Sequence, residues 1–106
     1  MMNYIPIPEG AQPPMIKFNN QDEFHEQLDK HRHAIHMRTL YAIKYAHETN
    51  FNDEITIAFL NDEDTMLGCS PDVWIDNLQM SLEYFIEIED YEKCQLVKEL
   101  IDKLQS

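Results

Sequence analysis

Residues 70–106 read SPDVWIDNLQMSLEYFIEIEDYEKCQLVKELIDKLQS, and this stretch decides the fold. It opens with Ser70-Pro71-Asp72, a typical helix start with a capping hydroxyl, a proline at the first helical position and an acid in the first turn. Large apolar residues then recur every three or four positions, at Trp74, Leu78, Leu82 and Phe85. This spacing predicts an amphipathic helix that buries one face.

The apolar spacing is interrupted by the acidic run at residues 87–90 and resumes in the last part of the chain. The second apolar stripe consists of Tyr91, Cys94, Val97, Ile101 and Leu104. Two amphipathic helices joined by a short turn hide their stripes by packing antiparallel. Residues 70–106 are therefore predicted to form a helical hairpin, with Cys94 in its core.

The second half of this hairpin resembles a known contact module. Residues 85–104, FIEIEDYEKCQLVKELIDKL, look like the UVR motif, a helical hairpin of bacterial excision-repair subunits and McsA-type kinase adaptors. The likeness rests on the run 89–94 and on Val97-Lys98-Glu99 and the closing residues 101–104. Cys94 stands where the motif usually has alanine, and Lys98 stands where it usually has arginine. The resemblance implies a protein–protein contact module that pairs with another hairpin and has no enzymatic activity.

The net charge of −12 is concentrated in the second half of the chain. Residues 1–47 hold five basic and five acidic residues, whereas residues 48–106 hold three basic and fifteen acidic ones. Phosphate contacts by such an acidic half are disfavoured, and a basic protein surface is its physical complement. Solubility alone is the alternative interpretation of this charge. The predicted partner-binding residues on the hairpin are Glu87, Glu89, Asp90, Glu92 and Lys98.

The first part of the chain is predicted to be an extended arm followed by one long helix. Residues 1–14 contain four of the five prolines and cannot be helical, and we expect Tyr4, Ile5 and Ile7 to dock on the body. Asn19 and Asn20 are good capping residues, and they predict a helix from residue 21 to residue 48.

A small antiparallel sheet is predicted to accompany the helices. Residues 15–18 and 54–60 are strand candidates, and residues 65–69 return as a short strand after an acidic turn at 61–64. Residues 15–106 are thus expected to form one α+β domain, in which the long helix and the hairpin pack on the sheet. The predicted core residues are Phe24, Leu28, Ile35, Ile57, Phe59, Trp74, Leu78, Leu82, Phe85, Val97 and Ile101.

The long helix carries four of the eight lysines and arginines and all five histidines. Its basic segment comprises Lys30, Arg32, His33, His36 and Arg38. Two interpretations stand: the segment neutralises the acidic hairpin, within one chain or across a dimer, or it contacts an acidic protein or nucleic acid. Asp29, His33 and His36 have a spacing that permits three ligands for a divalent metal, although a solvated polar face is the leading interpretation.

The two cysteines and the amino terminus bear on chemistry and location. Cys69 precedes a helix, a position that is expected to lower a thiol pKa, but no base is identified for it. Residues 1–4 do not resemble a signal peptide, and no stretch reaches about 18 apolar residues, so no membrane span is expected. A reducing cytoplasm is the expected location, with the two cysteines as thiols.

These patterns favour a small, acidic, non-enzymatic interaction protein that uses no cofactor. We expect an adaptor or inhibitor that binds another protein through the hairpin, with homodimerisation as a further expectation. In size and acidity the chain also looks like small accessory proteins of bacteriophages, in which case the host cytoplasm is its location. The first alternative is a nucleic-acid-related role, either DNA mimicry by the acidic half or direct binding by the basic helix. The second is a metal-dependent activity at His33 and His36.

Overall fold

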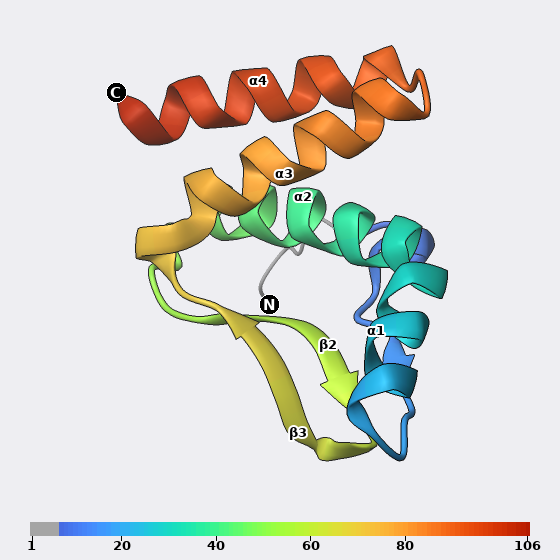
Figure 1. Cartoon of the computed structure of the whole chain (residues 1–106). Coiled ribbons are helices and arrows are strands. Elements are labelled where there is room, and N and C mark those ends of the chain that lie inside the picture. The colour runs from blue at the N-terminus through green and yellow to red at the C-terminus, as the bar shows by residue number, and fades with distance from the viewer. Residues whose placement is uncertain (1–6) are drawn as a thin grey trace.

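The computed structural model describes residues 7–106 and confirms the predicted α+β class (Figure 1). Residues 1–6 of the predicted arm, including Tyr4 and Ile5, lie outside the described residues. The elements in chain order are η1 (Glu9–Ala11), β1 (Met15–Ile16), α1 (Gln21–Lys30), α2 (Arg32–Glu48), β2 (Ile55–Leu60), β3 (Asp62–Cys69), η2 (Pro71–Val73), α3 (Trp74–Glu87) and α4 (Tyr91–Gln105). Helix α2 lies between the α3–α4 hairpin and the sheet.

The sheet is mixed, so the prediction of an antiparallel sheet is wrong for one of its strand pairs. Its order is β1-β2-β3, with β2 in the centre. β1 runs parallel to β2 and pairs Met15 with Phe59, whereas β2 and β3 form the predicted antiparallel hairpin. The parallel pair arises because α1 and α2 carry the chain back to the side of the sheet where β1 began, as a crossover connection does.

The hairpin between β2 and β3 is tighter than the predicted acidic turn at 61–64. Asn61 alone turns the chain, with a left-handed φ of 68°, and β3 begins at Asp62. The side chain of Asn61 also accepts a hydrogen bond from the Phe18 amide at 2.8 Å, and its own amide donates to the Ile16 carbonyl at 2.9 Å. Asn61 therefore ties the end of β1 to the hairpin.

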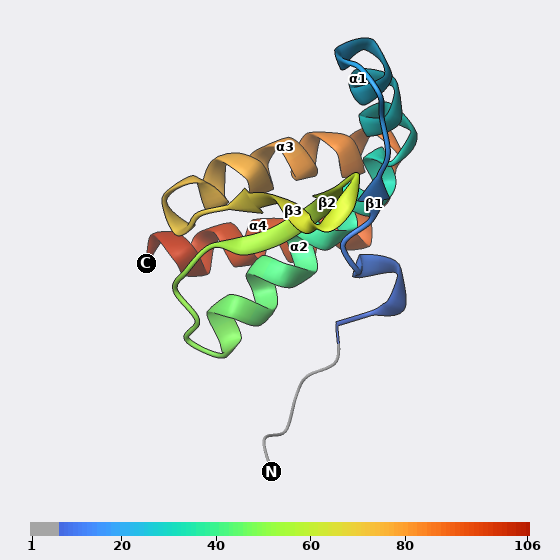
Figure 2. The same cartoon turned by 90° about the horizontal axis from the view of Figure 1, so that it is seen from below.

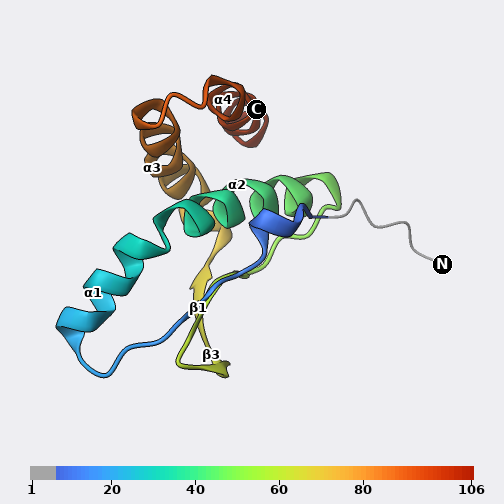
Figure 3. The same ribbon diagram turned by 90° about the vertical axis from the view of Figure 1, so that its right-hand side faces the viewer.

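The predicted long helix is broken at His31, so the expectation of one helix over residues 21–48 is wrong. α1 ends where His31 leaves the helical geometry, with φ −97° and ψ 11°, and α2 starts at the next residue in a new direction (Figure 3). Asn20 caps α1 as predicted, because its side chain accepts the Glu23 amide at 2.9 Å. α1 projects from the body and has no buried residue, so Phe24 and Leu28 are only half-buried and the prediction that they are core residues is wrong.

The core forms where α2 packs between the sheet and the α3–α4 hairpin, and Figure 2 shows the strands in front of these helices. Trp74, Leu78, Phe85, Val97 and Ile57 are buried as predicted. Other predicted core residues are only half-buried; these are Ile35, Phe59, Leu82 and Ile101. Fully buried residues outside the predicted core list include Ile16, Leu40 and Ile43.

The α3–α4 hairpin forms as predicted, but its start differs in detail. The turn η2 precedes α3, and Ser70 contributes its carbonyl to the Val73 amide rather than a capping hydroxyl. Asp90 caps α4 by accepting the Lys93 amide at 3.4 Å, and its carboxylate pairs with the Lys93 ammonium at 3.1 Å. These bonds hold the pKa of the Asp90 carboxyl below its usual value, first through the side-chain hydrogen bond from Lys93.

The end of α3 places a glutamate in a conformation that favours glycine. Glu89 has φ 60°, and the amides of Glu89 and Asp90 donate to the carbonyls of Ile86 and Phe85 at 3.0 and 2.9 Å. This pair of bonds is the Schellman motif, in which the left-handed residue is usually glycine.

We expect Glu89→Gly to raise the free energy of unfolding by about 0.5–1 kcal/mol. The left-handed conformation costs a non-glycine residue about 1–2 kcal/mol, and glycine removes this cost. Part of the gain is offset because glycine has greater conformational freedom in the unfolded chain. Urea unfolding followed by Trp74 fluorescence measures the change. Glu99→Gly, an exposed position in the interior of α4, is the matched control and should lower stability by a similar amount. A destabilised Glu89→Gly protein would contradict this account of the turn.

Candidate functional site: the hairpin, its basic helix and an apolar pocket

The basic helix and the acidic hairpin meet at Arg32. Its guanidinium lies 2.9 Å from the carboxylate of Glu87 and 5.0 Å from the centre of the Tyr84 ring. Lys30 pairs instead with Glu26 on its own helix, and Lys44 pairs with Glu48. The predicted neutralisation of the hairpin within one chain thus occurs at one residue pair, and three of the four basic side chains of the two helices face carboxylates.

The two central histidines of the basic segment contact α3. The Nδ1 atoms of His33 and His36 lie 2.8 Å from the Tyr84 hydroxyl and the Ser81 Oγ, respectively. The His36 ring also stacks on the Tyr84 ring, with centroids 4.6 Å apart. Burial of the ring, and then the charges of Arg32 and His33, lower the pKa of His36 from 6.5 to about 4. His36 is therefore a neutral packing residue at physiological pH.

The metal interpretation of Asp29, His33 and His36 finds no matching geometry. Among residues 7–106, no group of three or more histidine, cysteine or acidic side chains is placed to hold a metal ion. His33 and His36 turn their Nδ1 atoms toward hydroxyls of α3, and Asp29 is exposed on α1. The break at His31 separates Asp29 from the two histidines by placing them on helices of different direction.

Two of the predicted partner-binding residues form ion pairs within the chain, and the other three are exposed without one among the described residues. Glu87 pairs with Arg32, and Asp90 caps α4 and pairs with Lys93. Glu89 and Glu92 are exposed and make no ion pair among the described residues. Lys98 is exposed as well and lies farther along α4.

The turn between α3 and α4 also exposes three large apolar side chains. Ile86, Ile88 and Tyr91 are 49%, 43% and 64% exposed. The assignment of Tyr91 to the buried stripe of α4 is therefore wrong, because Tyr91 is the first helical residue and Cys94 takes the first inward position. We call residues 86–92 the hairpin tip. A run of alternating isoleucines and acids, Ile86-Glu87-Ile88-Glu89, is the sequence signal that marks it.

Both cysteines are buried thiols among the described residues. Cys94 lies in the core as predicted. The expectation of a lowered pKa at Cys69 is wrong, because burial raises its pKa to about 11, although a hydrogen bond from Asn77 opposes this shift. Cys69 is the last, buried residue of β3, and its carbonyl accepts a hydrogen bond from the Trp74 indole at 3.0 Å.

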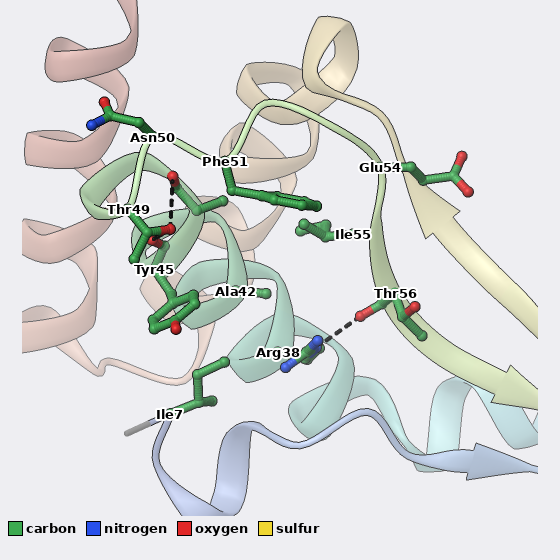
Figure 4. Close-up of a pocket in the computed structure, with 11 residues that line it drawn as sticks. Ile7, Arg38, Ala42, Tyr45, Thr49, Asn50, Phe51, Glu54, Ile55 and Thr56 are labelled. Atoms are coloured by element: carbon green, nitrogen blue, oxygen red, sulfur yellow. Dashed lines mark hydrogen bonds between the residues drawn. The ribbon is translucent and has the colours of Figure 1, made fainter. Parts of the chain in front are cut away.

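An apolar pocket of about 630 Å³ lies between the second half of α2 and the first half of β2 (Figure 4). We call it the α2–β2 pocket. Ala42 and Ala46 line its helical wall, and Phe51 and Ile55 line the wall opposite. Arg38 supplies the cationic group of the lining, and its Nε donates to the Thr56 carbonyl at 2.7 Å. The prediction placed Arg38 in the basic segment but did not place it in a pocket.

No protein-family model, no curated protein and no solved structure matches this chain. Within residues 7–106, none of the helices combines the length and the apolar composition that a membrane crossing requires.

Proposed function

We propose that this protein is a non-enzymatic interaction module that binds another protein through the hairpin tip. The observation that carries the proposal is the exposure of Ile86, Ile88 and Tyr91 at the end of the hairpin where α3 turns into α4. Large apolar side chains that lie together on a surface are typical of protein contacts, and tyrosine is among the residues that contribute most to binding.

The charges around the tip specify the chemistry of the partner. Glu89 and Glu92 border the apolar residues, and the half of the chain after residue 47 carries the whole net charge. Opposite charges across an interface accelerate association and select the partner. The partner we propose therefore presents an apolar patch bordered by lysine or arginine.

The likeness of residues 85–104 to UVR hairpins supports the same proposal, since those hairpins are contact modules. The tip corresponds to the acidic turn of the motif and its following aromatic residue. A role as adaptor or inhibitor follows from this mode of binding, and it requires no covalent chemistry from the chain.

The test is a partner search followed by a matched set of variants. A photo-crosslinking amino acid at position 88 captures the partner from an extract of the native cell, and mass spectrometry identifies it. The double variant Glu89→Lys and Glu92→Lys should then weaken binding of the purified partner about tenfold or more at ordinary salt, because attraction becomes repulsion. Reversal of Glu87 or Asp90 is avoided, because those side chains hold Arg32 and the start of α4.

Two further variants separate the tip from general acidity. Glu63→Lys with Asp64→Lys makes the same charge change on exposed positions of β3 and should alter binding by less than about threefold. Ile88→Ser with Tyr91→Ser removes the apolar contact without a change of charge and should weaken binding at every salt concentration. Wild-type affinity in both tip variants would refute the proposed function.

A further inference from the structure

The α2–β2 pocket owes its shape to the spacing of residues on α2. Arg38, Ala42 and Ala46 follow one another at intervals of four, so they lie on the same face of the helix. The two alanines fill little space between this face and β2, and the side chains of Phe51 and Ile55 close the pocket from the other side (Figure 4). The result is a cavity within the range of about 300–1,000 Å³ that is typical of small-molecule sites.

The guanidinium of Arg38 is held in place by one hydrogen bond, but its other donors have no partner among the described residues. Its Nε is fixed by the Thr56 carbonyl, and neither terminal amino group has a hydrogen-bond partner among the described residues. No buried side-chain nitrogen or oxygen in the described part of the chain lacks a partner, so these amino groups are open to solvent. Burial of the rest of the side chain lowers the pKa of Arg38.

No described carboxylate neutralises this charge, although the chain has 20 acidic residues. Glu54 contributes to the pocket lining, but its side chain turns away from Arg38 in Figure 4. Its carboxyl carbon lies over Gly68 of β3 instead, 2.5 Å from where a Cβ of that residue would stand. The space in front of the guanidinium is therefore left to an anion from outside the chain.

We propose that the α2–β2 pocket binds a small organic acid with an aliphatic body, whose carboxylate pairs with the Arg38 guanidinium. A guanidinium binds a carboxylate through two parallel hydrogen bonds, and such charge-assisted bonds are stronger where water is partly excluded. The aliphatic body lies against Ala42, Ala46 and Ile55, with Phe51 over it. This site is separate from the hairpin tip and does not depend on its function.

The test is an NMR titration of the full-length, isotope-labelled protein with octanoate. Saturable shifts are expected for the amides of residues 50–56, without shifts at the hairpin tip. The uncharged analogue 1-octanol should bind about tenfold more weakly or worse, because it lacks the carboxylate. Equal binding of octanol and octanoate, or the absence of saturable shifts, would overturn the proposal.

Variants assign the binding to the pocket. Arg38→Gln should weaken octanoate binding about tenfold or more, whereas Arg32→Gln removes the same charge from the first residue of α2, outside the pocket, and should leave it unchanged. Phe51→Ala changes a half-exposed side chain and should weaken binding severalfold, which keeps the test valid if Arg38→Gln perturbs folding. Unaltered binding in both pocket variants would refute the site. A short peptide with a carboxyl-terminal leucine is the second probe. Tighter binding of this peptide than of octanoate would overturn the small acid as the occupant and assign the pocket to a peptide carboxylate.

Discussion

Replacement of Phe85 by alanine should lower the free energy of unfolding by about 3–5 kcal/mol, the typical loss for a buried aromatic ring. The ring is fully buried where α3 faces α2 and α4, and it meets the ring of Tyr84 edge-on at 5.4 Å between centroids. Small domains have a total stability of about 5–15 kcal/mol, so this change removes a large part of it. Chemical denaturation of the two proteins measures the difference.

The neighbouring residue is the control for this prediction. Ile86 is half-exposed at the hairpin tip, and its replacement by alanine should cost less than about 1 kcal/mol. The contrast also bears on the proposed function, because an apolar side chain that contributes little to folding is available for a partner. Equal losses for Phe85→Ala and Ile86→Ala would show that the tip belongs to the core, and the binding proposal would then lose its main support.

The stability of the protein should fall as the pH is lowered through 6.5 toward 4. Burial, together with Arg32 and His33, lowers the pKa of His36 to about 4, whereas the unfolded chain retains a value near 6.5. Between these values the unfolded state binds a proton that the folded state does not, so protonation favours unfolding. With allowance for solvent screening of a half-buried ring, the free energy of unfolding should fall by about 1–2 kcal/mol from pH 7 to pH 5.

A comparison with His36→Gln isolates the contribution of this histidine from those of the other titratable groups. Urea unfolding at several pH values should show a steeper loss of stability in the wild type than in the variant. His25→Gln replaces an exposed histidine of α1 and should retain the wild-type slope. Parallel slopes for all three proteins would contradict the assignment to His36.

The sequence predicts those elements whose signal is local. The spacing of Trp74, Leu78 and Phe85 defines the buried face of α3, because a helix repeats its face every three or four residues regardless of what packs on it. The cap at Asn20 is equally local, since it depends on an amide three residues away. These predictions are confirmed.

Features that depend on distant contacts could not be predicted in this way. The periodicity of residues 21–48 continues through His31, and the break there depends on where α2 packs against α3 and the sheet. The direction of β1 likewise depends on the path of two helices. The sequence marks Arg38 only as a basic residue, because its hydrogen bond to Thr56 and its place in a pocket arise from the pairing of α2 with β2.

The parallel pairing of β1 with β2 also has a consequence for the order in which the chain is assembled. Met15 pairs with Phe59, and both α1 and α2 lie between them, so β1 leaves the ribosome well before its partner strand exists. Pro13 and Pro14 directly precede β1 and have no amide hydrogen to donate. Before β2 is synthesised, the segment around β1 therefore offers few backbone hydrogen-bond donors to other nascent chains. The carbonyl of Pro14 accepts the Phe59 amide once β2 has emerged.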